Sequence, residues 1–197
     1  MLTPSSNSQQ PKDSTLETLA VSQAEIDAQP TYEAEISTAK AYWKNRTNNA
    51  AFTDIKTCLK DRASAKKYCC YCEHNEFSDI EHFYPKTLFP KKAFIWENYL
   101  YVCGVCNSKY KNDTFSIFVG NNVLDVSPTT PRVYAEPATT DSVLINPNEE
   151  NPMDFLFLNL RTGVYIANFL NEDERTEIRA EYTLEVLNLA RFERERR

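Results

Sequence analysis

Apolar residues recur at helical spacing through the first third of the chain. In each of three stretches this spacing places the apolar residues on one face of a helix, which predicts amphipathic helices over residues 14–28, 31–46 and 50–63. Pro30 separates the first two helices. We therefore expect a helical arm, residues 14–65, that packs on the rest of the protein. The segment before it, residues 1–13, is rich in Ser, Gln, Asn and Pro and is expected to be disordered.

Shorter patterns follow the arm. Two strand-like pieces, residues 67–71 and 79–83, precede a loop that contains Pro85 and Pro90, and a helix is predicted over residues 106–111. The next segment is rich in Pro, Thr and Asn and is expected to be mainly loop, with strands only at residues 115–119 and 143–145.

The C-terminal part carries the signature of a β-hairpin and a helix. Residues 155–160 and 164–167 flank a turn that contains Gly163, which predicts the hairpin. Asn171, with Glu174 three residues later, resembles an N-cap pair that opens a helix through Leu187. Helices combined with short local strand pairs predict an α+β fold.

Composition narrows the class of protein. The chain has 197 residues, of which 42% are hydrophobic and 12% aromatic, enough for a packed core. No run approaches the roughly 20 consecutive apolar residues of a transmembrane helix. The N-terminal residues also lack the apolar segment of a secretion signal. We expect a cytoplasmic protein without a membrane partner.

Charge is distributed unevenly along the chain. The net charge is -6, but residues 1–59 carry -2, residues 60–112 carry +3 and residues 113–197 carry -7. A basic middle between acidic ends can hold a nucleic-acid site that the net charge conceals. Scatter of ordinary surface charge explains the same pattern equally well.

The cysteines carry the strongest chemical signal. Four of the six form two C-x2-C pairs, Cys69 with Cys72 and Cys103 with Cys106. In a reducing compartment such pairs bind metal more often than they form disulfides, which predicts a structural zinc site. We interpret Cys58 as a core residue and Cys70 as a packing residue. His74 is a less favoured alternative zinc ligand.

A second set of polar residues lies between and just after the cysteine pairs. It contains the adjacent Glu81 and His82, then Asn98, and finally Asn107 directly after a cysteine. Neighbours on a strand point to opposite faces. Glu81 and His82 would therefore need a twist or a bulge to act on one phosphate.

The run C-x2-C, E-H-F-x-P-K, W-x-N-x-L and C-x2-C-N resembles the HNH endonuclease family. The resemblance covers about a quarter of the chain and implies a ββα-metal finger over residues 66–112, clamped by Zn2+. Residues 113–197 would then supply a loop, a β-hairpin and a helix that pack on the finger.

A narrower resemblance extends into the C-terminal part. The segment L-I-N-P-N-E-E-N-P at residues 144–152 is similar to the HNH nuclease subunit of Septu-type and retron-associated anti-phage systems. That resemblance implies an antiviral effector that works with an ATPase partner. Two departures stand out: Glu81 replaces the usual Asp, and Tyr110 replaces the usual Lys, with Lys109 and Lys111 on either side.

The resemblance also implies roles for individual residues. His82 would deprotonate the attacking water, Glu81 and Asn107 would hold Mg2+ or Mn2+, and Asn98 would fix the loop. The lysines that would neutralise DNA phosphates are Lys86, Lys91, Lys92, Lys109 and Lys111. The alternatives are a zinc finger that binds nucleic acid or protein without catalysis, an RNase, and a stand-alone restriction-type nuclease.

Overall fold

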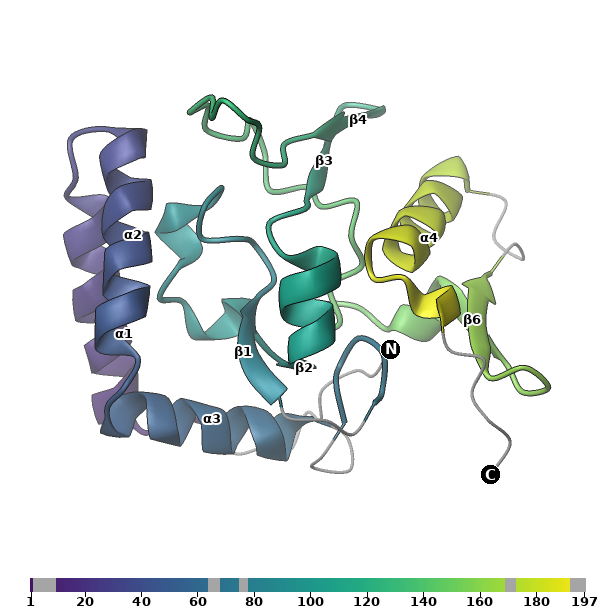
Figure 1. Ribbon diagram of the computed structural model, residues 1–197, viewed down its shortest axis with the longest axis horizontal. Helices are drawn as coiled ribbons and strands as arrows, with labels where there is room; N and C mark the ends of the chain where they lie inside the picture. Colours follow the sequence, from purple (N-terminus) through teal and green to yellow (C-terminus); the bar gives the residue numbers. More distant parts are fainter. Residues whose placement is uncertain (2–9, 64–67, 75–77, 169–172, 192–197) are drawn as a thin grey trace.

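The computed structural model describes residues 1, 10–63, 68–74, 78–168 and 173–191. Within these residues the fold is α+β, as predicted: it contains four α-helices and three separate two-stranded antiparallel sheets (Figure 1). None of the helices in the described ranges is long and apolar enough to cross a membrane.

The three predicted helices of the arm are present. They are α1 (Asp13–Asp27), α2 (Tyr32–Arg46) and α3 (Ala50–Arg62). Side chains cap the second and third: Thr31 accepts a hydrogen bond from the Ala34 amide, and Asn49 accepts one from the Phe52 amide. In Figure 1, α1 and α2 lie side by side and α3 runs across their lower end. The helices of the arm contact one another, and their buried faces pack on the finger.

The N-terminal segment differs in part from the predicted disorder of residues 1–13. Gln10 accepts a hydrogen bond from the Trp96 indole at 2.8 Å, and the Lys12 amide donates to Asp54 at 3.0 Å. The amino group of Met1 forms an ion pair with Glu73 at 3.0 Å. Residues 2–9 lie outside the described residues.

The central element is an antiparallel hairpin followed by a helix. Strand β1 (Ser78–His82) pairs with β2 (Tyr99–Cys103), and His82 lies opposite Tyr99. The connection contains two 3-10 turns, η2 (Pro90–Lys92) and η3 (Trp96–Asn98). The helix η4 (Val105–Lys111) is a π-helix, in which the Asn112 amide donates to the Asn107 carbonyl at 2.8 Å.

The predictions for this region are partly wrong. Strand β1 and helix η4 were expected, but β2 was not, because its apolar run lacks the alternation of a half-buried strand. The strand predicted over residues 67–71 does not exist among residues 68–71, where the chain forms the turn that carries Cys69 and Cys72. Lys67 lies outside the described residues.

The C-terminal part contains two further hairpins and a helix. Their bounds are β3 (Ser116–Val119), β4 (Asn122–Asp125), η5 (Pro152–Asp154), β5 (Leu156–Asn159), β6 (Val164–Ala167), α4 (Glu174–Val186) and η6 (Leu189–Arg191). The hairpin of β5 and β6 was predicted and β4 was not. Residues 143–145 are buried but form no strand, since only the adjacent Ser142 makes an isolated bridge, to Ile117. Asp173 caps α4, and the predicted cap, Asn171, lies outside the described residues.

Two hydrophobic clusters hold the β1–β2 hairpin from opposite sides. On one side, Phe94, Trp96 and Tyr99 pack with the buried faces of α1, α2 and α3. On the other side, Leu100 and Val102 belong to a cluster that reaches the last hairpin and α4. The hairpin is therefore fixed in place by both flanking parts of the chain.

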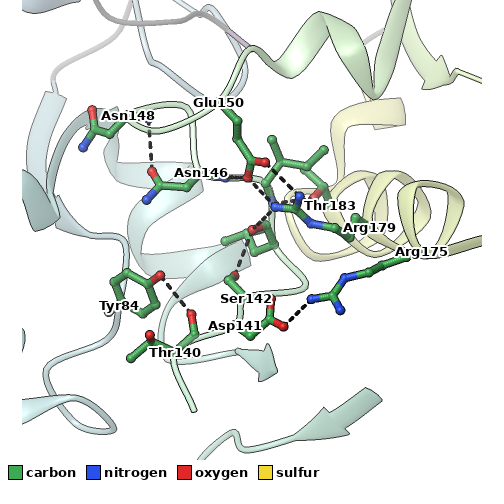
Figure 2. Close-up of polar contacts among 12 residues, drawn as sticks. Tyr84, Thr140, Asp141, Ser142, Asn146, Asn148, Glu150, Arg175, Arg179 and Thr183 are labelled. Carbon is green, nitrogen blue, oxygen red and sulfur yellow. Dashed lines mark hydrogen bonds and ion pairs between the residues drawn. The ribbon is translucent and has the colours of Figure 1, made fainter. Parts of the chain in front are cut away.

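Polar contacts fasten α4 to residues 141–150, the loop that leads into the β5–β6 hairpin (Figure 2). Arg179 forms an ion pair with Glu150, and Arg175 forms one with Asp141. Asn148 donates to the backbone carbonyls of Glu97 and Tyr99 at 2.9 and 3.1 Å, so the same segment also holds the start of β2. The C-terminal part is thus joined to the finger by specific hydrogen bonds as well as by apolar packing.

Candidate metal centre and candidate active site

The four paired cysteines converge at one end of the β1–β2 hairpin. Cys69 and Cys72 lie in the turn before β1, Cys103 ends β2, and Cys106 lies in the first turn of η4. Their four Sγ atoms lie within 4.8 Å of one another, and all four residues are buried. None of these four cysteines forms a disulfide within the described residues.

The geometry of this cluster fits zinc. Tetrahedral Zn2+ with Zn–S bonds of about 2.3 Å places its sulfurs about 3.8 Å apart. The Sγ atoms of Cys72 and Cys103 are 3.7 Å apart, far from the roughly 2.05 Å of a disulfide. Hydrogen bonds from the neighbouring thiols lower the pKa of Cys103, and the hydrogen bond with Cys103 raises the pKa of Cys69. The four cysteines could therefore hold a structural zinc ion.

The other cysteines and His74 have separate places. Cys58 is fully buried in α3, in the cluster that joins the arm to the finger. Cys70 is also buried, and its amide donates to the Tyr101 carbonyl at 2.9 Å. His74 is exposed and its carbonyl accepts from the Cys69 amide. Among the described residues, the group with metal-binding geometry contains only the four paired cysteines.

A small polar cavity of about 90 Å3 lies at the opposite end of the hairpin. Its lining residues are Trp43, Ile80, Glu81, His82, Pro85, Lys86, Asn107, Asn112 and Asp113. The structure thus brings together four of the residues singled out in the sequence: Glu81, His82, Asn107 and Lys86. Glu81 and His82 reach the same cavity although they are neighbours, at the point where β1 ends and the chain bends.

His82 is held in one orientation within this cavity. Its Nε2 lies 2.9 Å from the Ala93 carbonyl. Because a carbonyl can only accept, Nε2 carries the hydrogen, and Nδ1 of the neutral ring is free to accept a proton. The ring packs on Trp43, with centroids 4.1 Å apart. Burial, with a smaller contribution from the charge of Lys86, lowers the pKa of His82 well below its usual value, so the ring is neutral at pH 7.

Lys111 is not a surface lysine. It is fully buried, and its Nζ lies 2.5 Å from Glu81 Oε1 and 2.9 Å from the His82 carbonyl oxygen. Burial raises the pKa of Glu81, and the charge of Lys111 opposes that shift. The predicted contact between Lys111 and a DNA phosphate is therefore corrected: its ammonium group is used inside the finger.

Asn98 connects the two ends of the loop between the strands. Its Oδ1 accepts from the Tyr84 amide at 2.8 Å, and its Nδ2 donates to the carbonyls of Tyr84 and Lys92 at 3.0 and 2.8 Å. Asn98 is buried and does not line the cavity. All three hydrogen bonds hold the loop that precedes β2.

The other four lysines lie in different surroundings. Lys86 lines the cavity, its Nζ is 5.6 Å from the centroid of the Trp43 ring, and burial lowers its pKa. Lys91 pairs with Glu136, with Glu35 slightly farther away, and Lys92 lies over the ring of Tyr84. Lys109 is exposed on η4, two residues from Asn107.

Three lining residues were missed in the sequence. Trp43 lies within the predicted helix over residues 31–46, and no local pattern shows that this helix would reach His82. Asp113 adds a second carboxylate to the cavity, and Asn112, with φ of 44°, turns the chain that presents it. The available signal was the polar run Asn112–Asp113 directly after the predicted helix.

Comparisons with known proteins add no assignment to this geometry. No protein-family model matches the chain, and no curated protein matches it. The assignment of chemistry therefore depends on the residues of the two sites themselves.

Proposed function

We propose that the protein is a metal-dependent endonuclease of the HNH type that hydrolyses phosphodiester bonds of DNA. The observation that carries the proposal is the cavity shared by His82, Glu81 and Asn107. It lies on the same hairpin as a four-cysteine cluster with the geometry for zinc. The order β1, β2, η4 supports the ββα finger that the resemblance implies.

His82 is the proposed general base. Its protonated nitrogen is committed to the Ala93 carbonyl, which leaves Nδ1 as the acceptor for a proton from water. Its lowered pKa keeps the ring neutral, and hence able to accept, throughout the neutral pH range. The neighbouring Trp43 and Tyr99 rings limit rotation of the imidazole.

The cavity offers the donor atoms that a hard divalent cation prefers. Glu81, Asn107 and Asp113 supply carboxylate and amide oxygens, the ligands typical of Mg2+ and Mn2+. When bound there, such an ion would polarise the scissile phosphate and stabilise the leaving oxygen. Lys111 holds one oxygen of Glu81, so the carboxylate is oriented before any cation arrives.

The substrate proposal depends on the cations at the cavity. Lys86 lines it, and Lys109 is exposed on η4, the helix that also supplies Asn107, so a phosphate backbone bound there would meet positive charge. These contacts bind phosphates and not base edges, which favours cleavage with little dependence on sequence.

A second candidate is a zinc-stabilised binding module without catalysis. It is favoured by the ion pair between Glu81 and Lys111, which already neutralises the carboxylate. In that case the cavity would be a buried polar network and the lysines alone would bind nucleic acid.

We further propose that the protein is the nuclease effector of an antiviral system and acts with an ATPase partner. The proposal comes from the resemblance of residues 144–152 to such subunits. It is supported by the exposed apolar side chains of the β5–β6 hairpin and its turn, Phe157, Leu160 and Ile166, which offer a surface for a partner protein.

Plasmid cleavage with Mg2+, Mn2+ or no added divalent cation tests the nuclease proposal. We expect nicking or linearisation that depends on the cation and falls by at least tenfold in Asn107→Ala. The matched control is Asn122→Ala, an exposed asparagine of β4, which should cut like the wild type. Binding of DNA without cutting under every condition would favour the second candidate.

A further inference from the structure

The helical arm forms one wall of the candidate active site. Trp43 of α2 lines the cavity, and its ring contacts His82 with centroids 4.1 Å apart. The same ring packs against Phe52 of α3 and Phe94 of the finger, at 5.3 and 5.8 Å. The position of α2 relative to the cavity is therefore fixed by tight aromatic packing.

Three segments without any acidic residue meet at this cavity. They are residues 36–53, 82–96 and 98–112, which carry three, three and two Lys or Arg side chains. The rest of the chain has 14 Lys and Arg against 28 Asp and Glu. Each acid-free segment supplies lining residues, Trp43, Lys86 and Asn107 among them. The three segments thus carry eight cationic residues and no acid in a chain of net charge -6, although Glu81 and Asp113 also add two carboxylates to the cavity lining.

Several of these cations already have acidic partners. Arg46 pairs with Glu25, Lys91 pairs with Glu136, and Lys111 is buried against Glu81. Lys40 and Lys44 of α2 differ from them in having no acidic partner among the described residues.

Both lysines are exposed, and neither forms an ion pair with an acid in the described part of the chain. Four residues apart on a helix, they lie on the same side. Lys40 is close enough to Lys86 that its charge contributes to lowering the pKa of Lys86.

We propose that Lys40 and Lys44 make α2 a second contact surface for the phosphate backbone of the DNA bound at the cavity. The inference rests on the proposed nuclease function and deepens it. The substrate would lie across the mouth of the cavity and contact α2 on one side and Lys86 and η4 on the other, above the packed rings of Trp43 and His82. The arm would then bind substrate as well as support the finger.

Binding of a short fluorescein-labelled DNA duplex, followed by fluorescence anisotropy without added divalent cation, tests this inference. We expect Lys40→Gln/Lys44→Gln to weaken binding about tenfold and to flatten the dependence of log K on log salt by about two, roughly one per lysine. The matched control is Lys56→Gln/Lys60→Gln on α3. These lysines have the same spacing and are also exposed, but their helix contributes no residue to the cavity lining, whereas α2 contributes Trp43. The control should bind like the wild type.

Two results would overturn the inference. One is an unchanged affinity and salt dependence in Lys40→Gln/Lys44→Gln, and the other is an equal loss in the α3 control, which would indicate a general charge effect. A wild type that cuts plasmid while either result holds would leave the nuclease proposal standing and remove only the role of α2. A wild type that neither binds nor cuts DNA would remove both.

Discussion

The two ends of the β1–β2 hairpin carry side chains of different chemistry. At the cysteine end, where Ser78 lies opposite Cys103, four buried thiols converge. At the cavity end, where His82 lies opposite Tyr99, an imidazole, carboxylates and an amide line a polar cavity. One five-residue strand pair separates the two.

The difference indicates a division of roles. Four thiolates fill the coordination of zinc completely, so a metal there can stabilise the fold but has no position open for a substrate. Oxygen donors around a cavity suit a cation that keeps water and exchanges ligands. The cysteine end is therefore expected to control folding, and the cavity end to control chemistry.

The largest expected effect is at the cysteine end. Cys103→Ser removes one zinc ligand, and structural zinc contributes roughly 10–16 kcal/mol in isolated zinc fingers. We expect loss of zinc and unfolding of the finger, measured by elemental analysis and circular dichroism. Cys58→Ala, at a buried cysteine outside the cluster, should keep its zinc and lose only about 1 kcal/mol. Equal effects of the two variants would contradict the assignment of the metal centre.

The next largest effect is expected for Lys111→Met at the cavity end. It leaves the Glu81 carboxylate buried without its cation, which costs about 3–5 kcal/mol of unfolding free energy. Urea unfolding would measure this loss, and the additional change Glu81→Gln should recover part of it. Lys109→Met, exposed on the same helix, should change the unfolding free energy by less than about 0.5 kcal/mol.

Asn98→Ala tests the loop that connects the two strands. The substitution removes three hydrogen bonds of one buried amide, which should cost roughly 2–4 kcal/mol of unfolding free energy while zinc is retained. Asn45→Ala, at an exposed position of α2, is the control. An Asn98→Ala protein as stable as this control would show that the loop does not depend on these bonds.

The smallest effect is the acid sensitivity of the cavity end. The pKa of His82 is lower in the folded than in the unfolded protein, so the unfolded state binds the additional proton. Stability is therefore full above about pH 6.5 and should fall below it by up to about 1.4 kcal/mol per pH unit. His82→Gln should flatten this slope in urea titrations, whereas a slope identical to the wild type would contradict the assigned environment of His82.

The sequence predicts the cysteine end better than the cavity end for a physical reason. The C-x2-C spacing determines a turn and its two ligands locally, so Cys69, Cys72, Cys103 and Cys106 could be grouped without a structure. The cavity depends on contacts between distant segments, such as Trp43 against His82. No local pattern reports these contacts.

The secondary structure shows the same contrast between local patterns and distant contacts. Apolar periodicity predicted α1, α2 and α3 nearly to the residue. Strand β2 was missed because it is buried on both faces and does not alternate. The burial of Lys111 could not be foreseen either, because its partners, Glu81 and the His82 carbonyl, come from a strand about thirty residues earlier.

The most direct test of the division of roles is to measure zinc content and plasmid cleavage on the same preparation of His82→Gln. Glutamine can still donate a hydrogen bond to the Ala93 carbonyl, so the fold should be kept. We expect one zinc per chain, as in the wild type, with Mg2+-dependent cleavage reduced at least 100-fold. Cleavage at the wild-type rate, or loss of zinc together with cleavage, would contradict the division of roles.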